Sequence, residues 1–176
     1  MAKLKHNYTG SSLLELRDKF GIGKGGFYDN DWWLDEDFAK DKAPKGIYEI
    51  DFDTKLFNLT YEEQKKKLKK GWHFPQPAII AEAILTHYEK TGERLLEEWW
   101  SRANVVASGG RRVGVGFFGS DGLGVGGYWD DCRGDNMGAL PPSRKLKSLK
   151  AGNLDSLEDR IIELEKFKEK VEKFIK

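Results

Sequence analysis

The chain has 176 residues, and its 30 Lys and Arg almost balance its 29 Asp and Glu, for a formal net charge of +1 at pH 7. This length suits one domain with its own core, and the near-neutral charge gives no reason to expect nucleic acid or an anionic membrane as a partner. A single cysteine excludes an intramolecular disulfide and a cysteine-rich zinc site, and the sequence has neither a membrane-length apolar run nor an apolar leader, so we expect a cytoplasmic protein.

The first part of the chain predicts a short helix and then a strand. Ser11–Phe20 carries apolar residues at helical spacing, and Gly21 directly after it is a typical helix end. Residues 46–53, GIYEIDFD, combine β-branched and aromatic residues in a run that indicates a strand.

Two further helices are expected before residue 92. Thr60 is a suitable N-cap, with Glu63 three residues on as its capping-box partner, for a helix that runs to about Lys70. We interpret the lysine-rich run 65–70 as the solvated face of this helix rather than as a nucleic-acid contact. Ala78–Thr91 follows two prolines and has a continuous apolar face, which indicates a buried helix.

The middle of the chain predicts a small, meandering antiparallel sheet. Its strands are expected at residues 95–106, 112–118, 123–129 and 137–143, joined by turns rich in Gly, Ser and Asp. Apolar residues alternate at Val113, Val115 and Phe117, which places the intervening glycines on the opposite face. Because strands so rich in glycine are weak alone, we expect large apolar side chains to anchor them. The candidate anchors are Trp99, Trp100, Phe118, Leu123, Val125 and Trp129.

This region also has an unusual composition. Residues 99–144 contain no Lys, Glu or Gln, although the chain has 22 Lys, 15 Glu and 2 Gln, and they hold 11 of the 20 glycines. An even spread would place about 10 of those long polar side chains in this window. A surface of backbone, short polar groups and aromatics is typical of an interaction face.

The last part of the chain, residues 151–176, predicts an amphipathic helix. Its apolar residues recur in steps of three and four and form a narrow stripe. Packing on its own domain and pairing with a second copy of the chain both fit this pattern.

The sequence motifs give little support for a cofactor site or a metal site. Residues 21–26 and 114–119 both fit G-x-G-x-x-G, but neither lies between a strand and a helix with an acidic residue some twenty positions on, so neither supports dinucleotide binding. His6, His73 and His87 lack the spacing of a metal site. We therefore expect no cofactor and no metal.

A group of aspartates and the lone cysteine are the remaining candidates for a reactive site. Asp121, Asp130, Asp131 and Asp135 suit either a calcium site or turns with arginine ion pairs, and we favour turns and ion pairs. Cys132 as a nucleophile lacks an activating base, since no histidine follows His87. With no acid–base pair or catalytic triad to assemble, we do not expect an enzyme.

The stretch RVGVGFFGSDGLGVGGYWDDCRGDNMGALPPSRK, residues 112–145, resembles the variable region of diversity-generating retroelement variable proteins, and the preceding TGERLLEEWWSRA resembles their lead-in. The resemblance covers about residues 46–150. It implies an α+β chain with a C-type lectin fold of the formylglycine-generating-enzyme type, without that enzyme's activity. In this family, template adenines are misread, so that AAC codons become NNC codons, which cannot encode Lys, Glu, Gln, Met or Trp. The compositional gap fits that restriction.

The resemblance divides the variable region into a fixed frame and ten exchangeable positions, which we call the slots. The frame would consist of Arg112, Val113, Val115, Gly116, Phe118, Asp121, Gly122, Leu123, Val125, Trp129, Asp130, Gly138, Arg144 and Lys145. The slots would be Gly114, Phe117, Gly119, Gly124, Gly126, Gly127, Tyr128, Cys132, Gly134 and Asn136. Six of the ten slots are glycine, so this chain would present a sparsely decorated face with Phe117 and Tyr128 as its main anchors.

The resemblance implies that residues 1–150 form a lectin-like domain that binds an unknown ligand, more plausibly a protein than a small molecule, through hypervariable side chains. Two features depart from the family: the Pro141–Pro142 pair near the end of the variable region, and the C-terminal helix. Two alternatives stay open at this point. One is a formylglycine-generating type of enzyme on the same fold, and the other is a scaffolding protein assembled by its C-terminal helix.

Overall fold

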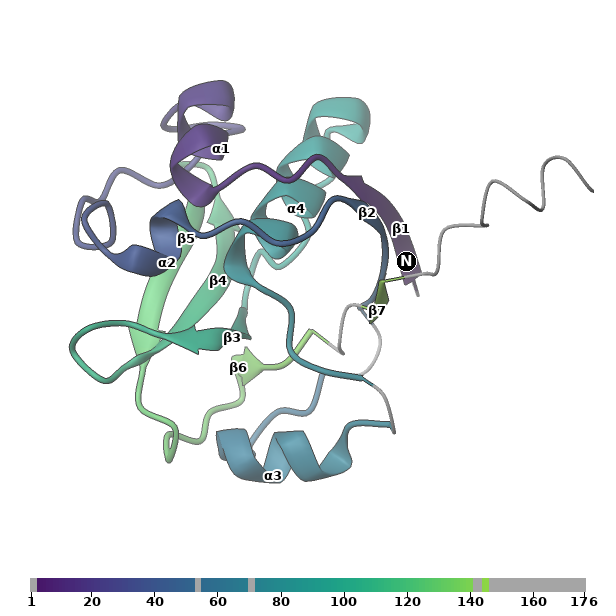
Figure 1. The fold of residues 1–176 in the computed structure, drawn as a ribbon, viewed down its shortest axis with the longest axis vertical. Helices are drawn as coiled ribbons and strands as arrows, with labels where there is room; N and C mark the ends of the chain where they lie inside the picture. Colours follow the sequence, from purple (N-terminus) through teal and green to yellow (C-terminus); the bar gives the residue numbers. More distant parts are fainter. Residues whose placement is uncertain (1–2, 53–54, 70–71, 141–143, 146–176) are drawn as a thin grey trace, which may run out of the picture. The chain divides into compact units, whose positions relative to one another are not determined.

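The computed structural model describes residues 3–52, 55–69, 72–140 and 144–145, which form an α+β structure with two sheets and four helices (Figure 1). The first sheet has the order β1-β2-β7, and the second has the order β5-β4-β3-β6. The strands are β1 (Lys3–Tyr8), β2 (Gly46–Asp51), β3 (Trp100–Val106), β4 (Arg112–Gly119), β5 (Gly122–Tyr128), β6 (Met137–Gly138) and β7 (Arg144–Lys145). The helices are α1 (Leu13–Phe20), α2 (Asp37–Lys40), α3 (Tyr61–Lys67) and α4 (Pro77–Thr91).

Helices α1 and α3 form where they are expected and both begin with a capping box, of which only the one at Thr60 was predicted. The Ser12 hydroxyl caps α1 by accepting from the backbone N–H of Glu15, whose side chain accepts from the Ser12 N–H in return. Thr60 and Glu63 form the same reciprocal pair at the start of α3. Each capping box satisfies two backbone donors that the first turn of a helix otherwise leaves free.

Helix α4 lies at the centre of the structure. It begins at Pro77, ends at Gly92 in the left-handed conformation (φ 72°), and contacts α1, β1, β3 and β4. Its apolar residues are buried around most of its circumference, as are Glu82 and His87. Valines and leucines of β4 and β5 belong to the same core, so α4 gives the second sheet its apolar support.

The second sheet confirms three of the four expected strands and corrects the fourth. Strands β3, β4 and β5 are antiparallel neighbours, with Val115 opposite Val125 and Gly116 opposite Gly124. The fourth strand, β6, has only two residues and pairs with the start of β3 in parallel, so the predicted antiparallel meander is wrong there. The loop of residues 129–136 causes this, because it returns the chain along β3 in the same direction.

Three elements were not expected from the sequence: β1, α2, and β7, which pairs with β2. Strand β1 pairs with β2 in antiparallel register, and its His6 and Tyr8 are buried while Lys3 and Lys5 are exposed. Helix α2 is a single turn. The predicted C-terminal helix, residues 151–176, lies outside the described residues. None of the helices in the described part combines the length and apolarity needed to cross a bilayer.

Candidate functional site

The hairpin of β4 and β5 breaks the expected alternation at Phe117. Val113 and Val115 are fully buried as predicted, but the register shifts between Gly116 and Gly119, and Phe117 turns outward with 40% of its surface exposed. Phe118 then occupies the core position and is fully buried. Phe117 has a φ of 48°, in the left-handed region that residues other than Gly and Asn adopt rarely. Its outward direction is therefore set by an irregular backbone, not by simple alternation.

The three tryptophans of this region have different environments. Trp99 is buried and packs edge-on against Phe57, with ring centroids 5.3 Å apart. Trp100 is half-buried, and its ring packs at a tilt against Phe117 and Tyr128, with ring centroids 5.4 Å and 5.5 Å apart. Trp129 is 55% exposed, so its predicted role as a buried anchor is wrong. It follows the last residue of β5 and so lies beyond the sheet.

A groove of about 610 Å³ opens beside this hairpin. Four aromatic residues line it, and we call it the aromatic groove: they are Tyr28, Trp32, Trp100 and Phe117. Slot glycines Gly119, Gly124 and Gly126 also line it. The volume lies in the range of ordinary ligand sites.

Residues far from the hairpin in sequence complete the aromatic groove. Phe27 bridges to Leu123, and the Tyr28 N–H donates to the Leu123 carbonyl at 2.9 Å, which fixes the segment after α1 along β5. The Trp32 indole N–H donates to the Val125 carbonyl at 2.9 Å. The sequence reasoning missed Tyr28, Asn30 and Trp32; the only local signal was a cluster of aromatics and aspartates, FYDNDWW.

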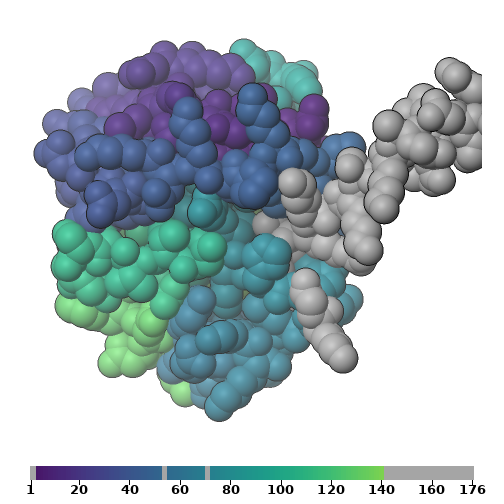
Figure 2. Space-filling model, in the orientation of Figure 1, coloured from purple at the N-terminus to yellow at the C-terminus, as the bar shows by residue number. Residues whose placement is uncertain are grey.

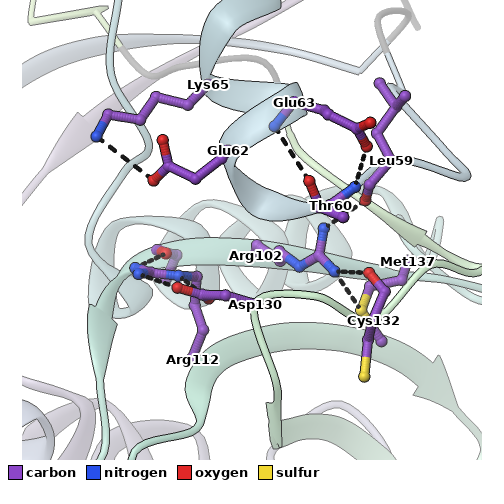
Figure 3. A network of polar contacts seen from close by, with 11 residues as sticks. Leu59, Thr60, Glu62, Glu63, Lys65, Arg102, Arg112, Asp130, Cys132 and Met137 are labelled. Carbon is purple, nitrogen blue, oxygen red and sulfur yellow. Dashed lines mark hydrogen bonds and ion pairs between the residues drawn. The ribbon is translucent and has the colours of Figure 1, made fainter.

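The loop that follows β5, residues 129–136, is held in place by a buried arginine side chain. The guanidinium of Arg102 on β3 donates to the Leu59 carbonyl at 3.0 Å and to the Cys132 carbonyl at 2.6 Å (Figure 3). Burial lowers the pKa of Arg102 from its ordinary value. Since a buried cation is costly without partners, these bonds tie the loop to β3 and to the segment before α3.

A second arginine confirms part of the expected aspartate chemistry. Arg112 pairs with both carboxylate oxygens of Asp130, at 2.6 and 2.9 Å, and its guanidinium lies 3.4 Å from the centroid of the Tyr61 ring. Asp121 lies at the other end of the hairpin and accepts from the Ser120 hydroxyl. In the described part of the chain, no three His, Cys, Asp or Glu side chains are grouped as a metal site would require.

Eight of the ten slots lie in two groups, and Trp100 contacts both groups. Phe117, Gly119, Gly124 and Gly126 line the aromatic groove, and Tyr128 stacks on Trp100 beside it. Cys132, Gly134 and Asn136 lie in the loop after β5, where Asn136 accepts from the Trp100 N–H at 2.8 Å. The two remaining slots are under the Tyr128 ring (Gly114) and beside Arg111 and Trp32 (Gly127). Tyr128, Cys132 and Gly134 are half-buried and Asn136 is exposed, but Gly114 and Gly124 are buried, so the slots do not all lie on an exposed surface as expected.

The loop after β5 also lies beside α3. The Asn58 N–H donates to the Gly134 carbonyl, and the Tyr61 N–H donates to the Asp130 carbonyl, both at 2.9 Å. In the space-filling view the green segments of the second sheet and this loop lie next to the blue segment of α3 (Figure 2).

Burial raises the pKa of Tyr128 from its ordinary value of 10 to about 12. The phenol therefore presents a neutral hydroxyl, and does so to higher pH than a free tyrosine side chain.

The glycines of this region fall into two classes when the space around each is considered. A side chain at the frame position Gly116 would overlap the Trp99 carbonyl, and one at Gly122 or Gly138 would collide with the backbone of Phe27 or Lys55. At the slot positions, the nearest atoms are side chains or nothing at all. Gly119 has no heavy atom within 4 Å of an added Cβ, and Gly127 has the Arg111 side chain at 3.3 Å.

One slot is intermediate between these classes. A Cβ at Gly124 would lie 2.5 Å from the Trp100 ring and 2.9 Å from the carbonyl oxygen of Gly116. The other slot glycines have neighbours no closer than 3.1 Å, and none of the six slot glycines has a left-handed φ. At five of the six, an L side chain therefore needs only small shifts of neighbouring side chains.

Comparison with protein-family models, with curated proteins and with solved structures finds no match to this chain.

Proposed function

We propose that this chain is a ligand-binding variable protein of a diversity-generating retroelement, with a C-type lectin type of scaffold. In this proposal the frame residues hold the backbone, and the ten slots supply exchangeable side chains that recognise protein targets. The protein binds and does not catalyse, and it acts without a cofactor or a metal. The sequence resemblance in residues 112–145 is the starting point of the proposal.

The observation that carries the proposal is the division of the glycines. Frame glycines Gly116, Gly122 and Gly138 face backbone atoms that cannot move aside, whereas five of the six slot glycines face open space or movable side chains. A scaffold that must accept many different residues at chosen positions needs this division, because overpacking against backbone destabilises a fold. The split was drawn from a resemblance, and the space around eight of these nine glycines, all but Gly124, supports it independently.

The arrangement of the scaffold gives the binding mechanism. Slot side chains on the hairpin extend from strands supported by α4, and those of residues 132–136 extend from a loop held by Arg102. A backbone fixed in this way loses little conformational freedom on binding, so that contact energy is not consumed by ordering the loop. Aromatic residues at slots, here Phe117 and Tyr128, supply contact area at low entropic cost.

A library experiment tests the proposal. The codons of the ten slots are replaced together by NNC, and the soluble, cooperatively melting fraction of the full-length variants is measured. A matched library carries NNC at Gly116, Gly122 and Gly138. We expect most slot variants to fold and the frame library to collapse, and selection from the slot library to yield binders of chosen proteins. Equal collapse of both libraries would contradict the proposal.

The genome offers an independent check. A near-copy of the segment that encodes residues 112–145, with AAC at the ten slots and a reverse transcriptase gene beside it, is the expected arrangement. Substitutions scattered equally over frame and slot codons would contradict it.

A further inference from the structure

The aromatic groove has a chemical character that the slots alone do not explain. Three of its four rings, those of Tyr28, Trp32 and Trp100, lie outside the ten slots, so they would stay constant while the slots vary. Tyr28 is 48% exposed and Trp32 is 36% exposed, so both rings are accessible to a ligand. The groove therefore combines a constant aromatic part with the variable positions Phe117, Gly119, Gly124 and Gly126.

Acidic side chains predominate at the aromatic groove, although Arg17 and Arg111 lie beside it. Of the described residues that line it, only Asp121 is charged, and its carboxylate is exposed. Asp29 and Asp31 flank the lining residue Asn30, with side chains that are 75% and 79% exposed, and a single arginine, Arg17, pairs with both. The groove thus presents ring faces and a carboxylate together.

The chain itself shows that one of these rings accepts a cation. The Arg111 guanidinium lies 5.8 Å from the centroid of the Trp32 ring, although Arg111 does not line the groove. The negative face of an aromatic ring attracts a cation, and the attraction strengthens where several rings exclude water around it. An aliphatic ligand would gain from the apolar lining but would gain nothing from Asp121.

We propose that the aromatic groove binds a positively charged side chain, Lys or Arg, that a partner protein presents to the variable face. The rings of Tyr28, Trp32 and Trp100 surround the cationic group, and Asp121 neutralises it. This constant anchor would hold one charged residue of the partner while the slots select among partners. The inference rests on the proposed function for the presence of a protein partner, but the charge preference of the groove is measurable without one.

The test compares three small probes with unbranched side chains of comparable length on the full chain: N-acetyl-lysine amide, N-acetyl-arginine amide and N-acetyl-norleucine amide. Binding is followed by the backbone amide resonances of Gly119, Gly124 and Gly126 and by the Trp32 indole resonance. We expect saturable shifts with the two cationic probes, and at least fivefold weaker binding of the norleucine probe. Added salt should weaken only the cationic probes.

Two variants identify the source of the selectivity. Asp121→Asn should weaken the lysine probe about three- to tenfold and leave the norleucine probe unchanged. Asp131→Asn is the matched control, because it removes the same charge from an exposed residue that does not line the groove. Tyr28→Leu keeps an apolar side chain but removes a ring, and it should weaken the lysine probe by a similar factor.

Each alternative result has a definite meaning. Equal binding of the lysine and norleucine probes, equal effects of the two aspartate variants, or no shift with any probe would overturn the cation site. None of these results would affect the outcome of the slot library. Collapse of that library with intact lysine selectivity would instead reject the variable display and keep the groove.

Discussion

Strands β4 and β5 contain glycines of two kinds. Gly116 lies so close to the backbone of Trp99 and Trp100 that a Cβ has no space, whereas a Cβ at Gly114 would meet the Tyr128 ring at 3.3 Å and the Ser101 carbonyl oxygen only at 3.6 Å. Glycine at the first position allows two segments of backbone to approach, and glycine at the second leaves a place for a side chain. Composition alone shows an excess of glycine; only the surroundings separate the glycines that the fold requires from those that the proposed binding face could exchange.

The sharpest way to break this comparison is to add one methyl group at each kind of position. We expect Gly116→Ala to lower the free energy of unfolding by about 3 kcal/mol, because its methyl group would lie 2.8 Å from the Trp100 Cα and overlap the Trp99 carbonyl. Gly114→Ala should cost about 1 kcal/mol or less, since the Tyr128 ring can move. Chemical denaturation of both variants measures the difference, and equal costs would reject the two classes.

A second prediction concerns the part of the molecule that should stay unaffected by changes in the slots. Glu82 on α4 is buried and accepts from the Thr9 N–H at 3.1 Å and from its hydroxyl at 2.6 Å, with His6 at 3.4 Å. Burial alone would raise its pKa, but the bonds from His6 and Thr9 hold the pKa of Glu82 below its ordinary value of 4.5. This carboxylate ties β1 and the loop after it to α4.

A lowered pKa in the folded state means that the ionised carboxylate stabilises the fold above about pH 4.5 and that this stabilisation is lost as the pH falls through the lower folded value. Glu82→Gln should therefore cost about 1–3 kcal/mol at pH 7, and this cost should shrink as the pH falls from 4.5 through the lowered folded-state pKa. Denaturation of both proteins across this range tests the expectation. A cost that is independent of pH would show that the charge contributes nothing, and a change in probe binding at the aromatic groove would show that the two regions are coupled.

The sequence predicted those elements whose signals are local. The capping box at Thr60, the glycine after α1, and the proline and glycine that bound α4 depend on neighbouring residues only, so these three helices were found close to their observed limits. Strand β1 and the parallel pairing of β6 depend on partners more than 30 residues away, and were missed. In β1 the buried positions His6 and Tyr8 carry polar groups, so the sequence shows no clear alternation of apolar and polar residues there.

The candidate site was only half readable for the same reason. The slots came from a contiguous motif, but Tyr28 and Trp32 reach the groove through bonds to the carbonyls of Leu123 and Val125, which no local pattern predicts. The outward turn of Phe117 depends on a register shift in the hairpin, and regular alternation predicts the opposite direction. Irregular backbone and long-range contacts thus account for what the sequence reasoning missed.

The smallest expected effects come from within the slots and sharpen the comparison most finely. Gly124→Ala should cost about 1–2 kcal/mol, because its methyl group would meet the Trp100 ring at 2.5 Å and the Gly116 carbonyl oxygen at 2.9 Å. Gly119→Ala, with no heavy atom within 4 Å of the added carbon, should change stability by no more than about 0.5 kcal/mol. Denaturation curves rank the two variants, and the Trp100 indole resonance reports whether the ring is displaced in the Gly124→Ala variant alone.

A Gly124→Ala variant as stable as Gly119→Ala, with a shifted Trp100 resonance, would show that this ring moves aside freely and that side chains at slot 124 reshape the aromatic groove. A loss as large as that of Gly116→Ala would instead place Gly124 with the frame and reduce the exchangeable positions to nine of the ten proposed, because a carbonyl oxygen of a neighbouring strand cannot move as a side chain can.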